Sequence, residues 1–190
     1  LIFATGNEGK MKEVREILAD SGYEILSMKE AGVDLEIVED GTTFEENALI
    51  KARAVMEATG ELTLADDSGL EIDAFDGGPG VYSSRYLGED TPYTEKNQII
   101  LDKMKDVPEQ ERTARFVCVI AAIFPDGQTY TTRGTMEGII GYEASGENGF
   151  GYDPIFYLPE LKKYSAQLSS NEKNELSHRG EALRKMKEVL

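Results

Sequence analysis

Apolar residues recur along the chain with two different spacings, which predicts an alternation of strands and helices. Short apolar runs such as Ile2–Ala4 have the length of buried strands. Between such runs, Met11, Val14 and Leu18 recur at the spacing of one helical face. The pattern predicts strands near residues 2–4, 23–28, 35–38, 62–65, 115–124 and 128–138, and helices near residues 10–20, 42–60, 91–104 and 169–190.

Capping and turn residues mark where several of these elements begin and end. Thr42, with Glu45 three residues later, predicts a capping box at the start of the second helix, and Gly60 ends that helix. The residues Pro125–Gly127 join two apolar runs in the manner of a hairpin, and the last helix is expected to break near Ser177. Helices that alternate with strands and precede a hairpin predict one mixed α/β domain over residues 1–190, built as two lobes.

Charge and composition narrow the classes of partner that this chain can bind. The 190 residues carry a formal net charge of −16, whereas nucleic acids and anionic membranes need a basic face, so neither is expected as a partner. A small polyphosphate is still compatible, because charges are screened over about 8 Å at physiological salt. Cys118 is the one cysteine and cannot form an internal disulfide, and no signal or membrane-spanning pattern is present, so a cytoplasmic location is expected.

Two adjacent carboxylates and a hydroxyl, Asp66, Asp67 and Ser68, follow the apolar run 61–65 directly. We expect them in a turn at a strand end, where open α/β sheets bind their ligands. Glu39 also follows a predicted strand, and two or three converging carboxylates would suit Mg²⁺. The alternative is an ordinary Asx turn, with Glu39 one of many turn acids in a chain that has 36 acidic residues.

Two loops could bind the ends of a nucleotide. The turn from Thr5 to Lys10 lies between a predicted strand and a helix, so its backbone amides and the Lys10 charge form a candidate anion site. An ordinary helix-entry turn explains the same residues. Gly149 and Gly151 flank Phe150, which would let this ring stack on a base, although a simple hairpin has similar residues.

Other polar residues carry little signal by themselves. Asn47 and Lys51 are four residues apart in a predicted helix and therefore share a face. His178 is the single histidine, and a lone histidine next to Arg179 is more often a core or surface residue than a functional one. Lys173 fits an ordinary solvated helix face.

Six short motifs occur in one order along the chain, and together they are far more specific than any one of them. They are Ala4–Lys10, Thr43–Ala52, Ala65–Leu70, Pro79–Ser83, Gly149–Phe156 and Ser177–Gly180. From end to end, this ordered set resembles the RdgB-like inosine/xanthosine triphosphate pyrophosphatase family. The resemblance implies an elongated two-lobed α/β fold with a central substrate cleft, a homodimer, and Mg²⁺-dependent conversion of ITP, dITP and XTP to the monophosphate and pyrophosphate, which removes them from the nucleotide pool.

The resemblance also implies roles for individual residues. Asp67 would accept a proton, and Glu39 and Asp67 would bind the metal ion. The implied substrate-binding residues are Thr5, Gly6, Asn7, Glu8, Gly9, Lys10, Lys51, Ser68, Phe150, Gly151, Tyr152, Asp153, Lys173, His178 and Arg179.

The chain departs from the family pattern at two places that bear on base preference. Gly146–Asn148 stands where the family usually has Gly-Thr-Gly-Gly, and Leu161–Ser165 differs from the usual Gly-Lys-Thr run. Two other functions fit parts of the pattern: a non-catalytic nucleotide-binding module, and a pyrophosphatase for other modified nucleotides such as methylated pyrimidines. The three acids at 39, 66 and 67 favour an enzyme, and Ser177–Gly180 favours purines.

Overall fold

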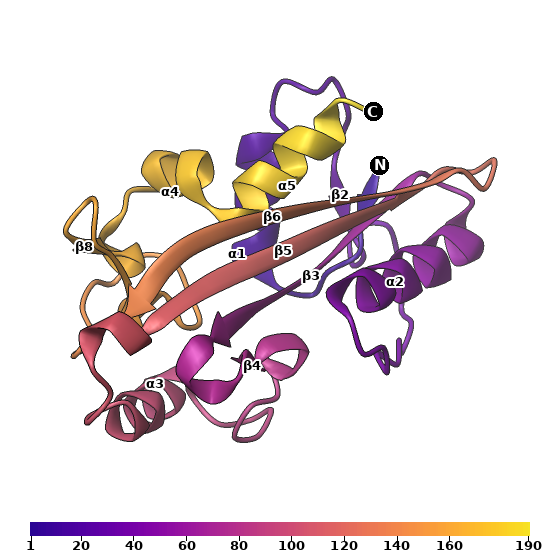
Figure 1. Cartoon of the computed structure of the whole chain (residues 1–190). Helices are drawn as coiled ribbons and strands as arrows, with labels where there is room; N and C mark the ends of the chain where they lie inside the picture. The colour runs from indigo at the N-terminus through magenta and orange to yellow at the C-terminus, as the bar shows by residue number, and fades with distance from the viewer. The chain divides into compact units, whose positions relative to one another are not determined.

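A mixed β-sheet forms the framework of the computed structural model, which describes all residues from 1 to 190 (Figure 1). The strand order is β2-β1-β3-β5-β6-β7-β8, and β4 pairs with β3. β1 is parallel to both β2 and β3, whereas β3–β4, β6–β7 and β7–β8 are antiparallel. The strands are β1 (Ile2–Phe3), β2 (Leu26–Ser27), β3 (Thr63–Ile72), β4 (Gly78–Pro79), β5 (Thr113–Ile123), β6 (Thr129–Ile140), β7 (Phe156–Leu158) and β8 (Lys163–Tyr164).

Five α-helices accompany this sheet, so the expected mixed α/β class is confirmed. None of them is both long and apolar enough to cross a lipid bilayer. The helices are α1 (Glu8–Ile17), α2 (Phe44–Thr59), α3 (Tyr93–Lys103), α4 (Ser170–Leu176) and α5 (His178–Lys187).

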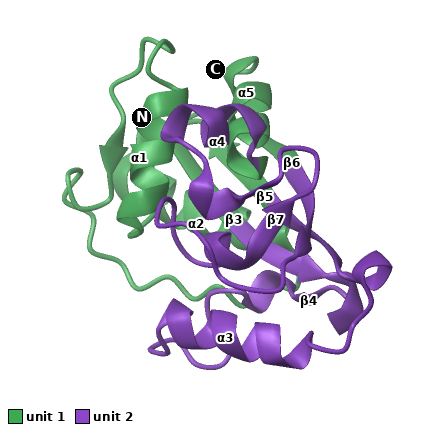
Figure 2. Cartoon of the chain, turned by 90° about the vertical axis from the view of Figure 1, so that its left-hand side faces the viewer, with its two compact units in different colours: residues 1–67, 118–134, 178–190 green, residues 68–117, 135–177 purple.

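The chain divides into two compact units, each with its own hydrophobic core (Figure 2). Unit 1 comprises residues 1–67, 118–134 and 178–190, and unit 2 comprises residues 68–117 and 135–177. A single catalytic domain with a cleft between two lobes stays a prediction.

Unit 1 is built from helices on both sides of its strands. Met11, Val14 and Leu18 are buried with Leu183 of α5 and Leu64 of β3, so the apolar face predicted for the first helix is confirmed. Figure 1 shows α1 and α5 together on one side of these strands and α2 on the other. Side chains of β3 in this unit therefore face either α1 and α5 or α2.

Unit 2 gathers its core from α3 and from the portions of β3, β5, β6 and β7 that belong to it. Ile100 of α3 and Met104, the residue that caps the C-terminus of this helix, are fully buried in this core with Leu70, Ile140 and Phe156. The core therefore fixes α3 to the strands of its own unit.

Gly134 in β6 allows α5 to approach the sheet closely. A Cβ atom at this position would lie 2.2 Å from the His178 carbonyl oxygen and 2.7 Å from the Ala182 nitrogen, and both are backbone atoms that cannot move aside cheaply. We expect Gly134→Ala to destabilise the protein by about 1–3 kcal/mol in urea unfolding. Gly6→Ala is the control for stability, because its added methyl group would have no atom within 4 Å other than those of its chain neighbours. Equal unfolding midpoints for the two variants would contradict the prediction.

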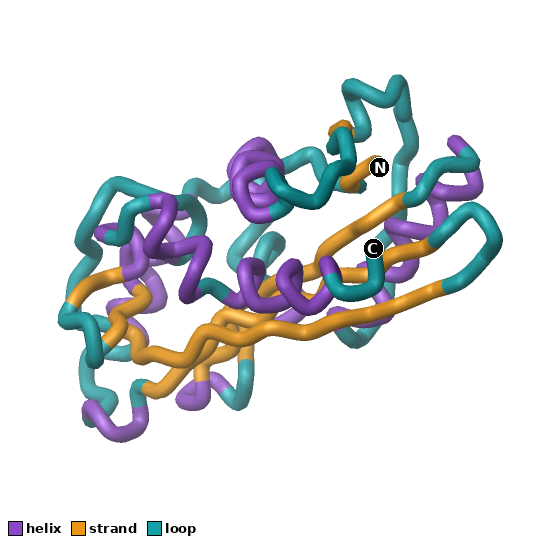
Figure 3. The backbone as a smooth tube through the Cα atoms, turned by 90° about the horizontal axis from the view of Figure 1, so that it is seen from above, coloured by secondary structure: helices purple, strands orange, loops and turns teal.

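Several boundaries predicted from the sequence are correct. The hairpin of β5 and β6 turns through residues 125–127, where the Gly127 N–H donates to the Phe124 carbonyl (Figure 3). The last helix is broken at Ser177, which separates α4 from α5, and Gly60 ends α2 in the left-handed conformation at φ 71°.

Other boundaries were wrong. Residues 35–38 form no strand, and the strand expected near 23–28 is reduced to Leu26–Ser27. The N-cap of α2 is Thr43, one residue later than predicted, and its hydroxyl accepts the Glu46 N–H. The Glu46 carboxylate in turn accepts the Thr42 N–H at 2.7 Å.

The predicted turn at Asp66–Gly69 is the largest error, since this segment lies inside the ten-residue strand β3. Adjacent strand residues point to opposite faces of a sheet, so the two aspartates are directed apart. Asp66 contacts residues of α1 and α5, whereas Asp67 contacts α2. The strand continues through polar residues because each buried carboxylate has a polar partner from a distant segment.

Candidate active site

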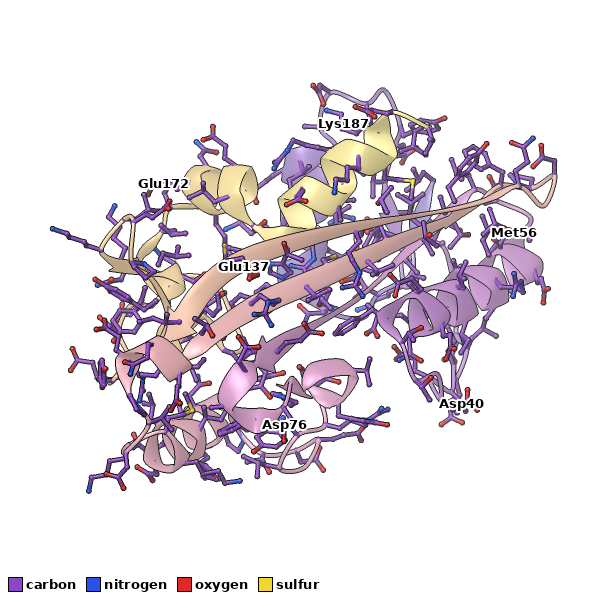
Figure 4. All side chains as sticks on the ribbon, viewed as in Figure 1. Asp40, Met56, Asp76, Glu137, Glu172 and Lys187 are labelled. Atoms are coloured by element: carbon purple, nitrogen blue, oxygen red, sulfur yellow. The ribbon has the colours of Figure 1, made fainter.

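Asp67 lies in unit 1 with its carboxylate held by α2. The side chain of Asn47 donates from Nδ2 to Asp67 Oδ2 at 3.2 Å and accepts the Gly41 N–H at Oδ1, at 2.9 Å. Gly41 is two residues from Glu39, and Figure 4 shows their neighbour Asp40 in the same loop before α2. One amide side chain therefore links Asp67 to the loop that carries Glu39.

Lys51, one turn further along α2, is a second neighbour that the two acids share. Its Nζ lies 3.3 Å from Glu39 Oε1, and its side chain is 12% exposed. Burial would lower the pKa of Lys51, but the charges of Asp66, Glu39 and Asp67 raise it above its ordinary value. The expected common face of Asn47 and Lys51 is confirmed, and the charges of three carboxylates act on one ammonium group.

The Asp67 carboxyl group has a raised pKa. Burial and, to a smaller extent, the neighbouring Asp66 charge raise it from 3.8 to about 6, against the opposing effects of Lys51 and the Asn47 hydrogen bond. The residue is 8% exposed. A carboxylate with a pKa in this range is suited to accept a proton at neutral pH.

Asp66 has the opposite electrostatic environment. Lys10 Nζ lies 3.0 Å from Asp66 Oδ2, and Arg179 Nη2 lies 3.4 Å from the same oxygen. Although burial favours the neutral acid, the charges of Lys10, Arg179 and Lys51 hold the pKa of Asp66 well below its ordinary value. Asp66 is thus a permanent anion that fixes the position of the Lys10 ammonium group.

Asp66 is linked through Arg179 to Glu13, and it also lies next to Cys118. Arg179 Nη1 is 2.5 Å from Glu13 Oε2, so the buried guanidinium bridges two carboxylates. Cys118 Sγ is 4.0 Å from Asp66 Oδ2, and burial raises the pKa of this thiol to about 12. Cys118 is therefore a neutral thiol without nucleophilic character at neutral pH.

The turn at residues 5–10 leads into α1 and presents the first amides of that helix. Asn7 is the N-cap residue, whose Oδ1 accepts the Lys10 N–H at 3.1 Å, and Thr5 Oγ1 accepts the Asn7 N–H at 3.1 Å. These bonds fix the turn. Helix N-termini attract anions through their unpaired N–H groups and the helix dipole.

In unit 2, Asp153 organises the loop that carries Phe150. Its Oδ2 accepts the Phe150 N–H at 2.9 Å and the Lys173 ammonium at 2.7 Å, and its Oδ1 accepts the Ser165 hydroxyl at 2.8 Å. Lys173 Nζ also lies 4.6 Å from the centre of the Phe150 ring. Asp153 and Lys173 are buried together, so they hold the aromatic ring in place.

The substrate-binding residues implied by the resemblance thus fall into two sets, each within one unit. Asp67 and Glu39, together with the lysines at 10 and 51, lie in unit 1, as do His178 and Arg179. His178 is buried at the start of α5. The unit 2 set is Ser68, Phe150, Gly151, Tyr152, Asp153 and Lys173.

Sequence reasoning did not assign the residues that orient these groups. Asn47 was placed on one helix face with Lys51, but its bond to Asp67 was not predicted. Glu13 could not have been found, because its partner Arg179 is 166 residues away and nothing local distinguishes it from other helix acids.

The residues around Asp67 fit a hard divalent cation in their chemistry. Glu39 and Asp67 offer carboxylate oxygens, the ligand type that Mg²⁺ prefers. The Lys51 ammonium group already places one positive charge near these two acids. No three His, Cys, Asp or Glu side chains are close enough to form a metal site by themselves. A cation held by this pair would complete its shell with water and substrate oxygens.

Comparisons with known proteins agree along the whole chain. A model of the Ham1 family matches residues 1–189. The chain is 51% identical over 190 residues to the dITP/XTP pyrophosphatase of Desulforamulus reducens, covering 100% of this chain and 94% of that protein. The Ham1 protein structures from Coxiella burnetii and Staphylococcus aureus superpose with TM-scores of 0.89 and 0.87, at 42% and 41% identity, each over 99% of this chain and 96% of the other.

Proposed function

The chain belongs to the Ham1 family, and on that basis we propose that it hydrolyses the nonstandard purine nucleoside triphosphates ITP, dITP and XTP to the monophosphate and pyrophosphate. A relative that is 51% identical to this chain over 190 residues is named dITP/XTP pyrophosphatase, and this name supports the substrate class. The observation that carries the chemistry is the environment shared by Glu39 and Asp67. The charges of both acids act on Lys51, and Asn47 links Asp67 to Gly41 in the loop that carries Glu39.

We propose that Glu39 and Asp67 bind Mg²⁺ and that the residues around them bind the triphosphate. When bound, the cation supplies positive charge that offsets the negative charge of the phosphates. The amides of the 5–10 turn, Lys10 and Lys51 supply further positive charge from this chain. In this way a protein with a strongly negative net charge would bind a polyanion at one local site.

Asp67 would act as the proton acceptor. A water oxygen forms a bond to the α-phosphorus, the bond from that phosphorus to the bridging oxygen breaks, and the water proton passes to the Asp67 carboxylate. Asn47 keeps this carboxylate oriented, since its amide is fixed by Gly41. Lys10 and Lys51 would stabilise the charge of the departing pyrophosphate.

The base would be bound by the Phe150 loop, with His178 and Arg179 reading its oxygen at position 6. Hypoxanthine and xanthine carry an oxygen there, whereas adenine carries an amino group that would face another donor. Such a mismatch of polar groups can reduce kcat/KM by about 10⁴-fold. The Arg179 guanidinium also contacts Glu13 and Asp66.

We further propose that residues 1–190 act as a single catalytic domain and that the protein forms a homodimer in the cytoplasm. The end-to-end resemblance to the pyrophosphatase family supports the single domain and the dimer, and the lone cysteine, Cys118, supports the cytoplasmic location. Light scattering coupled to gel filtration would measure the molar mass, and a mass of one 21.0 kDa chain would contradict the dimer.

Pyrophosphate release from ITP tests the proposed function directly. We expect ITP and XTP to yield the monophosphate and pyrophosphate with Mg²⁺, and EDTA to abolish the reaction. ATP and GTP should react far more slowly. Binding of ITP without turnover would identify a nucleotide-binding module instead. Release of orthophosphate would show that a different phosphate bond breaks from the one proposed. Equal rates on all four nucleotides would contradict base recognition.

A further inference from the structure

Asn97 of α3 contacts the Phe150 loop from within unit 2. Its Nδ2 donates to the Gly151 carbonyl oxygen at 3.1 Å, and the side chain is 4% exposed. The same helix places the Tyr93 ring edge-on against the Tyr152 ring, with centroids 5.1 Å apart and planes at 89°. The second half of the loop is therefore packed against α3.

One peptide group on each side of Phe150 is held by a buried side chain. Asp153 accepts the Phe150 N–H of the 149–150 peptide, and Asn97 donates to the Gly151 carbonyl of the 151–152 peptide. Gly149 and Gly151 have φ angles of +71° and +63°, in the left-handed region that other residues rarely adopt. A loop with such backbone freedom needs an anchor on each side of Phe150, because the backbone on both sides sets the direction of the ring.

Asn97 is not explained by packing alone. Its Oδ1 atom is buried and has no hydrogen-bond partner, so this amide retains an unsatisfied acceptor. A buried polar atom without a partner destabilises a fold, and an apolar residue of similar size would avoid that cost. The one hydrogen bond of this side chain is the bond to Gly151.

We infer that Asn97 is a positioning residue that sets nucleobase affinity by fixing the direction of the Phe150 ring. This inference rests on the proposed function, in which Phe150 stacks on the purine. Asn97 acts through the loop and has no part in the reaction at Asp67. Its loss therefore weakens substrate binding and leaves the chemical step intact.

Asn97→Leu tests this role, because it removes the donor to Gly151 and also the unsatisfied oxygen. We expect the KM for ITP to rise about tenfold with kcat changed less than twofold, since base stacking contributes to binding. Asn97→Asp keeps the shape but cannot donate, and it should raise the KM in the same way. Gln98→Leu is the matched control on the same helix, as Gln98 is exposed and bonds only to Asp102; it should leave both constants unchanged.

A double variant shows whether Asn97 acts through Phe150. In a Phe150→Leu background, Asn97→Leu should produce no further rise in KM, since the ring that it positions is gone. If the KM increases of Asn97→Leu and Phe150→Leu multiplied in the double variant, the inference would be overturned. An unchanged KM in folded Asn97→Leu protein, or a fall in kcat alone, would overturn it as well.

Hydrogen exchange gives a readout that does not depend on turnover. Amides of residues 149–153 should exchange at least tenfold faster in Asn97→Leu than in the parent and the Gln98→Leu control. If the parent failed to hydrolyse ITP, the proposed function would fall, and unchanged exchange in these residues would separately overturn the anchor. Faster exchange together with the KM change supports the positioning role.

Discussion

Asp67→Asn is expected to reduce pyrophosphate release from ITP by about 10³-fold or more. The amide cannot accept the water proton, and general-base catalysis alone contributes about 10²- to 10⁴-fold. It is also a poorer ligand than a carboxylate for a divalent cation. Because Asn has the same shape, the bond to Asn47 is retained and nucleotide binding should persist, which can be measured by calorimetry with ITP.

The same substitution should make the protein more stable at pH 8. Burial raises the pKa of Asp67 from 3.8 to about 6, so the folded state holds an unfavourable carboxylate above pH 6. A shift of this size corresponds to about 2–3 kcal/mol at pH 8. An acid with a raised folded pKa gains stability as the pH falls through that value, so the difference between variant and parent should shrink below pH 6 and vanish once the pH is below the unfolded value of 3.8. Urea unfolding in EDTA at several pH values measures this.

Asp40→Asn is the matched control for both measurements. Asp40 is exposed in the loop that carries Glu39, and its substitution should change neither rate nor stability (Figure 4). Turnover within a few-fold of the parent in Asp67→Asn would refute Asp67 as the proton acceptor. Loss of activity without any gain in stability at pH 8 would show that burial does not dominate the Asp67 environment.

The sequence was informative wherever local chemistry determines structure. The apolar spacing of Met11, Val14 and Leu18 predicted α1, and the turn residues 125–127 predicted the hairpin, because each signal lies within a few residues of its effect. The continuation of β3 through Asp66 and Asp67 was not predictable in this way. Isolated acids favour turns, and what keeps these two in a strand is their contact with segments far away in the chain.

The candidate site shows the same division. The spacing of Asn47 and Lys51 put both on one face of α2, and that face does point to Asp67 and Glu39. The resemblance supplied Asp153 as a substrate contact, but only the structure shows its bonds to the loop amide and to Lys173. Asn97 had no local signal, because its one partner is 54 residues away.

Asp66→Asn is expected to destabilise the protein by about 3–5 kcal/mol at neutral pH. Removing one partner of a buried ion pair leaves uncompensated charge, here the ammonium of Lys10 and part of the Arg179 guanidinium. Asp20→Asn is the control, since Asp20 pairs with Lys187 at the surface and its loss should not measurably shift the urea midpoint. Equal effects of the two substitutions would contradict the distinction between buried and exposed pairs.

The pH dependence of Asp66→Asn should be the reverse of that at Asp67. The pKa of Asp66 is held below its ordinary value of 3.8, so its stabilising effect is complete above that value and is lost as the pH falls towards the folded pKa. The deficit of Asp66→Asn should therefore be constant from pH 8 to about pH 5 and decrease in stronger acid. The stability contributions of these two neighbouring residues would then change with pH in opposite directions. Asp66 faces the positive charges of Lys10 and Arg179, whereas the burial of Asp67 beside α2 is only partly offset by positive charge. A deficit that grew as the pH fell would contradict the assignment of Asp66 as the permanently ionised member of the pair.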